Sequence, residues 1–196
     1  MSWTTPWIQR FANFAGMLLL ATTANAAEPI FQGLPWGATE AQIETRFAGQ
    51  TKRRICDSAL KQFADKLEQV CEGLYVEPYE VEGMPFKLSF NFSKKTRLLD
   101  NVSLDYSTEA PNVRPSSTPD ARWNDTFLKL KDTLTDRYGP PVSSYLGGER
   151  GSKMGSAEWR TGATIVRLQS LFWGSTSFEQ HSILYYSNMS GSAGKL

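Results

Sequence analysis

The sequence is poor in the side chains from which metal centres are built. Its 196 residues include two cysteines, Cys56 and Cys71, and one histidine, His181. A structural zinc site takes four such ligands, and no carboxylate cluster stands beside the histidine at ligand spacing. A single histidine just before a strand is typical of a surface or edge position. We therefore expect no metal site and no cofactor.

Local signatures of catalysis are also missing. No G-x-S-x-G marks a serine nucleophile, and the glycines between residues 147 and 155 do not match the phosphate-binding G-x-x-x-x-G-K-[ST] spacing, so this stretch predicts a loop. Two carboxylates that meet only in the folded chain would escape such a search, and Asp105 and Glu158 are the candidates for that acid pair. No catalytic residue can be assigned from the sequence.

An excess of charge of one sign is absent as well. The chain has 21 basic and 20 acidic residues, and its first 26 residues hold Arg10 and no acid, so the remainder is balanced. Nucleic acids and anionic membranes both attract an excess of positive charge. The one basic cluster, Lys52-Arg53-Arg54, is typical of a solvated edge. Neither kind of partner is expected.

No apolar run is long enough to cross a membrane. The longest, FANFAGMLLLATT at residues 11–23, falls short of the roughly 20 residues that a spanning helix needs. It follows Arg10 and precedes Ala24-Asn25-Ala26, which places small residues before a cut at Ala27. This pattern predicts a secretory signal peptide over residues 1–26 and a mature chain without a transmembrane segment. An uncleaved N-terminal anchor is the alternative.

The two cysteines predict a disulfide and constrain the helix between them. An even pair in an exported chain is most simply joined. A helical apolar stripe runs through the same segment, at Leu60, Phe63, Ala64, Leu67 and Val70. A straight helix over residues 57–71 would be roughly 20 Å long, whereas a disulfide holds its Cα atoms about 5.5 Å apart. We therefore expect the helix to end near Lys66 and the chain to double back.

The remaining pattern predicts a single α+β domain over residues 27–196. Thr39 and Gln42 form a capping box before a short helix, and Thr118-Pro119-Asp120 begins a longer helix that Gly139 ends. Alternating or apolar runs predict strands over residues 76–81, 86–92, 99–106, 142–146, 157–160, 163–173 and 182–187. We expect an antiparallel sheet with two or three helices on one face.

Two halves of the chain resemble each other. Residues 27–107 and 118–189 each contain a helix that ends in an aromatic residue followed by glycine or by alanine and glycine, and each continues into paired strands. This similarity suggests a duplicated helix-plus-meander unit. Trp36 and Trp173, each beside a glycine, are the aromatic residues expected to be exposed, and they mark a possible binding surface.

Four segments together resemble a known group of proteins: GLPWGATEAQI after the leader, the cysteine pair, the hairpin FKLSFNF with LLDNVSLDY, and the helix end RYGPP. They are similar to small, uncharacterised exported proteins of Gram-negative bacteria. The resemblance implies a periplasmic α+β module and provides no catalytic residues to transfer.

Three functions follow as hypotheses. The first is a non-enzymatic periplasmic module that binds an envelope protein or a small ligand. The second is a cell-envelope hydrolase acting on glycan or peptide, which requires two carboxylates, or His181 and a serine, to meet in one cleft. The third is an envelope assembly or inhibitor protein, which would carry an exposed apolar patch or a free sheet edge.

Overall fold

The structure is a computed structural model that describes residues 31–108, 121–149, 152–173 and 178–187. The predicted signal peptide and the start of the long helix at Thr118 lie outside these residues. In chain order the elements are α1 (Glu40–Arg46), β1 (Thr51–Arg54), α2 (Ser58–Lys66), β2 (Gly73–Val81), β3 (Met84–Phe92), β4 (Leu99–Thr108), α3 (Ala121–Tyr138), β5 (Ser143–Gly147), β6 (Ser152–Thr161), β7 (Thr164–Trp173) and β8 (Phe178–Ser187).

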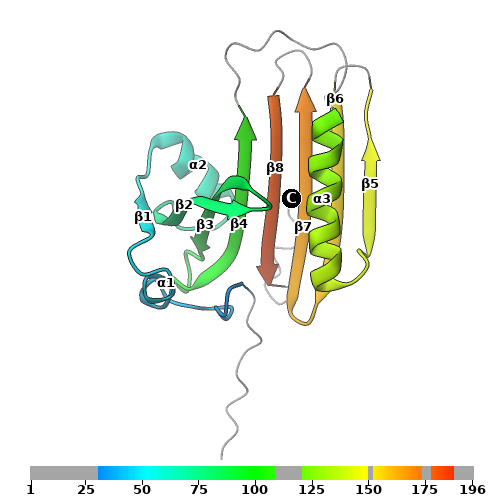
Figure 1. The fold of residues 1–196 in the computed structure, drawn as a ribbon. Coiled ribbons are helices and arrows are strands. Elements are labelled where there is room, and N and C mark those ends of the chain that lie inside the picture. Colours follow the sequence, from blue (N-terminus) through cyan, green and yellow to red (C-terminus); the bar gives the residue numbers. More distant parts are fainter. Residues whose placement is uncertain (1–30, 109–120, 150–151, 174–177, 188–196) are drawn as a thin grey trace, which may run out of the picture.

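All eight strands form one antiparallel sheet in the order β1-β2-β3-β4-β8-β7-β6-β5 (Figure 1). Two meanders of four consecutive strands meet where β4 pairs with β8, in a register that runs from Asn101 opposite Tyr186 to Thr108 opposite Glu179. The chain is therefore a mixed α+β protein, as the sequence predicts.

One face of the sheet carries the hydrophobic core. Alternate residues of the two central strands point to it: Val102 of β4 lies opposite Tyr185, and Leu104 lies opposite Ile183. All four are buried and belong to one cluster that spans both meanders. Helix α3 covers this face with an apolar stripe at i, i+4, i+7 and i+11, namely Trp123, Phe127, Leu130 and Leu134.

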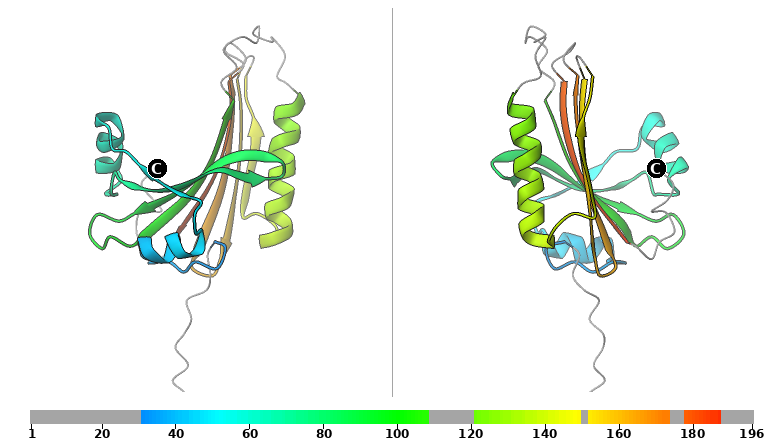
Figure 2. Two further views of the ribbon diagram at one scale, coloured as in Figure 1. Left: turned by 60° about the vertical axis from the view of Figure 1, so that its left-hand side comes forward. Right: turned by 90° about the vertical axis from the view of Figure 1, so that its right-hand side faces the viewer.

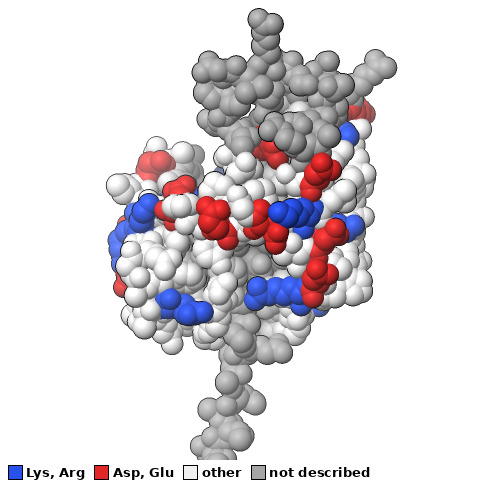
Figure 3. Space-filling view, viewed as in Figure 1, with Lys and Arg blue, Asp and Glu red and all other residues white. Residues whose placement is uncertain are grey.

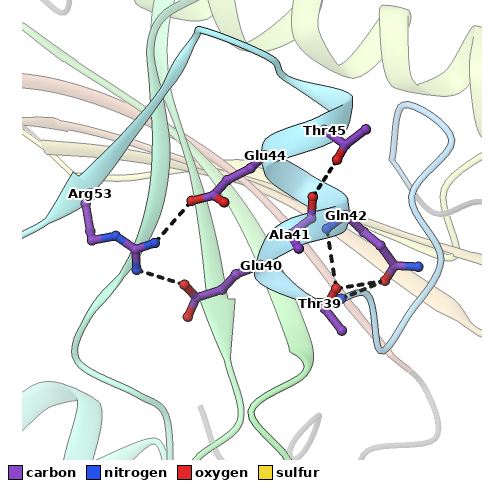
Figure 4. A network of polar contacts seen from close by, with 7 residues as sticks. All are labelled: Thr39, Glu40, Ala41, Gln42, Glu44, Thr45 and Arg53. Carbon is purple, nitrogen blue, oxygen red and sulfur yellow. Dashed lines mark hydrogen bonds and ion pairs between the residues drawn. The ribbon is translucent and has the colours of Figure 1, made fainter.

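Helix α1 packs on the same face and is tied to the edge strand β1. Phe47 at its C-terminal end lies against Phe90 of β3, with ring centroids 5.2 Å apart. The predicted capping box is present, since Thr39 and Gln42 bond each other's backbone N–H groups. Arg53 of β1 reaches back to Glu40 and Glu44 with bonds of 2.8 and 3.1 Å (Figure 4). These exposed pairs orient α1 more than they stabilise it.

Helix α2 lies on the other side of the sheet from α3 (Figure 2). It begins after the N-cap Asp57 and ends at Lys66, as the doubling-back of the chain requires. A disulfide joins Cys56 to Cys71 across the base of this segment, with Cα atoms 5.6 Å apart. The prediction of two or three helices on one face is therefore not shown for all three helices, because α2 lies on the face opposite α3.

The structure corrects two other expectations. The basic cluster at residues 52–54 is not merely a solvated edge but the strand β1, paired with β2. The predicted loop over residues 147–155 is too long, because β6 already begins at Ser152 and pairs with β7 along its whole length. Side chains in both segments alternate too weakly between apolar and polar for a period of two to be visible.

The contact between α3 and β6 gives a test of the core. A Cβ atom on Gly155 would lie 2.8 Å from the ring of Phe127, which is itself 1% exposed and has nowhere to move. We expect Gly155→Ala to lower the free energy of unfolding by about 1–3 kcal/mol through overpacking. Ser156→Ala on the opposite face is the matched control and should change it by less than about 0.5 kcal/mol. Urea unfolding of both variants measures the difference, and equal effects would contradict the packing.

Candidate functional site

The face of the sheet opposite the core is polar and forms the floor of a groove. Its floor residues alternate with the core residues of β3 and β4: Ser89, Asn91, Asn101, Ser103 and Asp105. The groove has a volume of about 1110 Å³, slightly above the usual range of about 300–1,000 Å³ for ligand pockets. A sheet face needs no such recess for stability, so this is the feature of the molecule that most resembles a binding site.

The wall of the groove is apolar. It is formed by α2 and by Ile55, which precedes the disulfide-bonded loop that carries α2. Leu60 and Phe63 of α2 line the groove, together with the C-cap residue Leu67. Phe63 is 62% exposed, and Ile55, which also lines the groove, is 87% exposed. Burial of a large apolar side chain is worth roughly 1.5–3 kcal/mol, so leaving two of them in water is a feature that a ligand can use.

Arg54 lies half-buried on the floor beneath this wall. Its Nε donates to the carbonyl oxygen of Cys71 at 3.0 Å, and its Nη2 donates to Oδ1 of Asn91 at 3.0 Å. Asn91 continues the network to Oδ1 of Asn101 at 2.7 Å. Burial lowers the pKa of the guanidinium, which still stays charged because arginine does not deprotonate in proteins.

Gly73 makes room for this guanidinium. A Cβ atom on this residue would lie 2.9 Å from Nη2 of Arg54 and 2.8 Å from the carbonyl oxygen of Phe90. The arginine can therefore lie flat across β2 and reach β3. Among the described residues no carboxylate pairs with it, and only two of its five N–H donors have a hydrogen-bond partner there, although Arg54 lines the groove.

A second cation on the floor is held by an aromatic ring. Lys87 lies opposite Asp105 in the β3–β4 register, yet its Nζ sits 4.4 Å from the ring centroid of Tyr75. The carboxylate of Asp105 accepts hydrogen bonds instead from Ser103 at 3.0 Å and Ser182 at 2.7 Å. Each oxygen of Asp105 thus accepts a hydrogen bond from a serine, and the Lys87 ammonium lies against an aromatic ring instead of this carboxylate.

A β-bulge turns one more carboxylate into the groove. The β3–β4 register shifts between Asn91 and Phe92, and Asp100 is the extra residue of β4. Both Asp100 and its neighbour Asn101 then line the groove, as bulges often re-aim a side chain. Burial raises the pKa of Asp100, and a hydrogen bond with Gln69 partly offsets this effect.

The acid pair considered from the sequence does not form. Asp105 is on β4 and Glu158 is on β6, with β8 and β7 between them. Three strand spacings amount to roughly 14 Å, beyond the separation of about 5–10 Å that glycoside hydrolysis needs. Glu158 is instead bonded to Arg167 at 2.8 Å and to Arg160 at 3.1 Å, and the hydrogen bond with Arg167 is the main cause of its lowered pKa.

Trp36 and Trp173 do not share a surface. Trp36 is half-buried against the core, and its Nε1 donates to Oγ1 of Thr164 at 3.1 Å. Trp173 is 51% exposed, as expected, but it ends the ten-residue strand that Thr164 begins. The two tryptophans are therefore separated by about 30 Å of strand. The prediction of an exposed Trp36 is wrong because its indole nitrogen finds a partner across the chain.

The prediction that His181 lies at a surface or edge position is also wrong, because its side chain is fully buried. Its Nδ1 is 2.7 Å from Oγ of Ser170, and its Nε2 is 2.7 Å from Oε1 of Glu179. This chain of serine, histidine and carboxylate has the composition of a hydrolase triad. Ser170 is only 1% exposed, however, and the imidazole is stacked between Trp123 and Tyr106. No substrate can reach the serine, so the cluster is a satisfied polar group within the core.

The opposite side of the molecule offers no comparable site in its described part. Charged side chains of both signs form a mixed band across α3 and the β2–β3 hairpin (Figure 3). Lys129 pairs with Glu82 there at 3.2 Å. Within the described ranges, no three histidine, cysteine or acidic side chains come together as a metal site would require. None of the helices described combines the length and the apolar character of a membrane span.

Comparisons with known proteins give no further guidance. A scan against protein-family models, a search of curated proteins and a search of solved structures each found no match. The site is therefore interpreted from its own geometry.

Two carboxylates predict opposite pH dependences of stability. A raised pKa in the folded state means that Asp100 binds its proton more tightly there, so its contribution to stability falls as the pH rises above about 3.9. The lowered pKa of Glu158 has the reverse effect, and its contribution is lost as the pH falls below about 4.3. Relative to wild type, Asp100→Asn should therefore gain stability as the pH rises, while Glu158→Gln should lose it. Urea midpoints from about pH 3 to pH 7 measure both, and profiles of the same sign would contradict these environments.

Proposed function

We propose that the protein is a non-enzymatic interaction module that binds an extended peptide segment in the groove between α2 and the sheet. The observation that carries the proposal is the unlike chemistry of the wall and the floor. The wall is the apolar face of α2, with Phe63 exposed. The floor, which faces this wall, carries serine and asparagine side chains.

An extended peptide matches this wall and this floor. Its successive side chains point in opposite directions, so alternating apolar and polar residues present one face to α2 and the other to the floor. An acyl chain would leave the polar floor without partners, and burying such groups unpaired is unfavourable. The floor strands β3 and β4 are already paired on both sides. Recognition therefore uses side chains, and no added strand is needed there.

The position of Arg54 defines the charge of the segment. Arg54 lines the groove without a carboxylate partner among the described residues, whereas each carboxylate oxygen of Asp105 already accepts one hydrogen bond, from Ser182 or Ser103. A carboxylate of the peptide, from an acidic side chain or the C-terminus, would bind this guanidinium through two parallel hydrogen bonds. Lys87 lies on the same floor and favours the same charge.

The cellular location of the protein is part of the same proposal. We infer that residues 1–26 are a cleaved signal peptide and that the mature protein is periplasmic. The Cys56–Cys71 disulfide supports this, because such bonds persist in oxidising compartments. The two four-stranded meanders, each with a helix before it, support a duplicated unit.

Binding of a synthetic peptide tests the function. The probe is a fluorescein-labelled peptide of alternating leucine and glutamate, and its counterpart has every glutamate replaced by glutamine. We expect fluorescence anisotropy to show saturable binding of the acidic peptide and at least tenfold weaker binding of the neutral one, a difference of about 1.4 kcal/mol. Phe63→Ser and Arg54→Gln should each weaken binding of the acidic peptide by about tenfold.

Matched variants outside the groove serve as controls. Leu146→Ser removes an exposed apolar side chain on β5, and Arg137→Gln removes an exposed cation at the end of α3. Both should bind like wild type. Absence of saturable binding to either peptide, or equal losses in the groove variants and the controls, would overturn the proposal.

A further inference from the structure

Five of the eight large apolar side chains with high exposure in the described part of the chain gather at or beside one edge of the sheet. Apart from those beside the groove and Trp173, the large hydrophobic residues with high exposure in the described part of the chain are Leu128, Val142, Tyr145, Leu146 and Met154. Three of them belong to β5 or to the residue before it, and Met154 lies on the neighbouring strand β6. Their exposed fractions run from 41% to 59%. We call this set, together with the outer edge of β5, the β5 edge.

These side chains lie both above and below the strand. Val142 and Leu146 share the face of α3, because Leu146 pairs with Gly155, whose Cα faces the ring of Phe127. Tyr145 points to the opposite face and extends over Gly147, since a Cβ there would meet its ring. The edge is thus apolar on both of its sides.

Leu128 extends this apolar strip onto α3. Lys129 and Thr133 reach Glu82 at the β2–β3 turn, which defines the flank of α3 that faces the first meander. At 100° per residue, Leu128 lies on the other flank. That flank faces β5, which borders α3 at the right of Figure 1.

The other edge of the sheet shows how this chain protects an edge strand. β1 carries Lys52, Arg53 and Arg54, and Arg53 is bonded to α1. Charged side chains and a covering helix are the usual means by which proteins prevent an edge from pairing with another chain. β5 has the sequence SSYLG, with no charge and no proline, and among the described residues no strand pairs with its outer side. The β1 edge is therefore protected against pairing with another chain, whereas the β5 edge has no such protection.

We propose that the β5 edge binds a second copy of the same chain, through antiparallel pairing of β5 with its counterpart around a two-fold axis. In a continuous sheet, opposed residues point to the same face, so the register must place odd residues opposite odd residues. The register centred on Tyr145 is the one that pairs all five residues. It places each Tyr145 opposite the other and Leu146 opposite Ser144.

Self-pairing fits the charge of this edge. A two-fold axis places each residue near its own copy or a close neighbour, and like charges in such positions are destabilising. β5 has none, so the axis opposes only neutral side chains. The chain already joins its two meanders by the same kind of contact, the antiparallel β4–β8 pairing. The dimer repeats this contact between molecules and covers the exposed apolar residues of both.

Sedimentation equilibrium of the mature chain over a micromolar concentration range tests the proposal. We expect a monomer–dimer equilibrium for wild type and at least tenfold weaker association for Leu146→Lys, which introduces like charges across the axis. Phe63→Ser, in the groove, should associate like wild type. A wild-type chain that stays monomeric, or a dimer that Leu146→Lys leaves unchanged, would overturn the proposal.

A cysteine cross-link tests the register without relying on a destabilising variant. Tyr145→Cys places two thiols at a Cα separation of about 4.5–5.5 Å in the dimer, within the range of a disulfide. Val142→Cys places them about 20 Å apart. Under mild oxidation the first variant should form a covalent dimer and the second should not, and the reverse result would contradict the register. Peptide binding and dimerisation use different residues, so either proposal can fail while the other stands.

Discussion

The pairing of β4 with β8 is the contact on which the rest of the structure depends. It joins the two meanders into one sheet, and its register decides which residues face each side. The register that places Val102 and Leu104 in the core also places Ser103 and Asp105 on the groove floor. A slip of one residue would exchange the two sets and bury the polar one. The core and the proposed binding surface are therefore fixed by a single register.

The groove needs a second constraint, because a flat polar sheet face would not form a recess. The loop that carries α2 is closed at its base by the Cys56–Cys71 disulfide. Next to this base, Val70 donates a backbone hydrogen bond to the carbonyl oxygen of Phe92, and Lys94 bonds Asp65 in the last turn of α2. The helix is thus held beside the floor without packing into it. This explains why Phe63 stays in water while Ala64, one residue on, is buried.

Sequence reasoning recovered what is local and missed what depends on partners far along the chain. The capping box of α1 and the end of α2 at Lys66 follow from short spacings and one distance constraint. The burial of His181 does not, because its partner Ser170 is placed opposite it only by the β7–β8 register. The sequence predicts a solvated charge at Arg54 because nothing in a run of three cations reveals that one of them lies against Gly73. The groove itself combines residues from seven elements and leaves no periodic signal.

Hydrogen–deuterium exchange of the oxidised wild-type chain, with and without the acidic leucine–glutamate peptide, tests the central claim most directly. α2 makes few tertiary contacts, so its amides should exchange quickly in the free protein. The account predicts that the peptide slows exchange in residues 56–70 and leaves β5 unchanged. Slower exchange at β5 with α2 unaffected would show that the peptide binds at the sheet edge, and would contradict the assignment of the groove as the binding site.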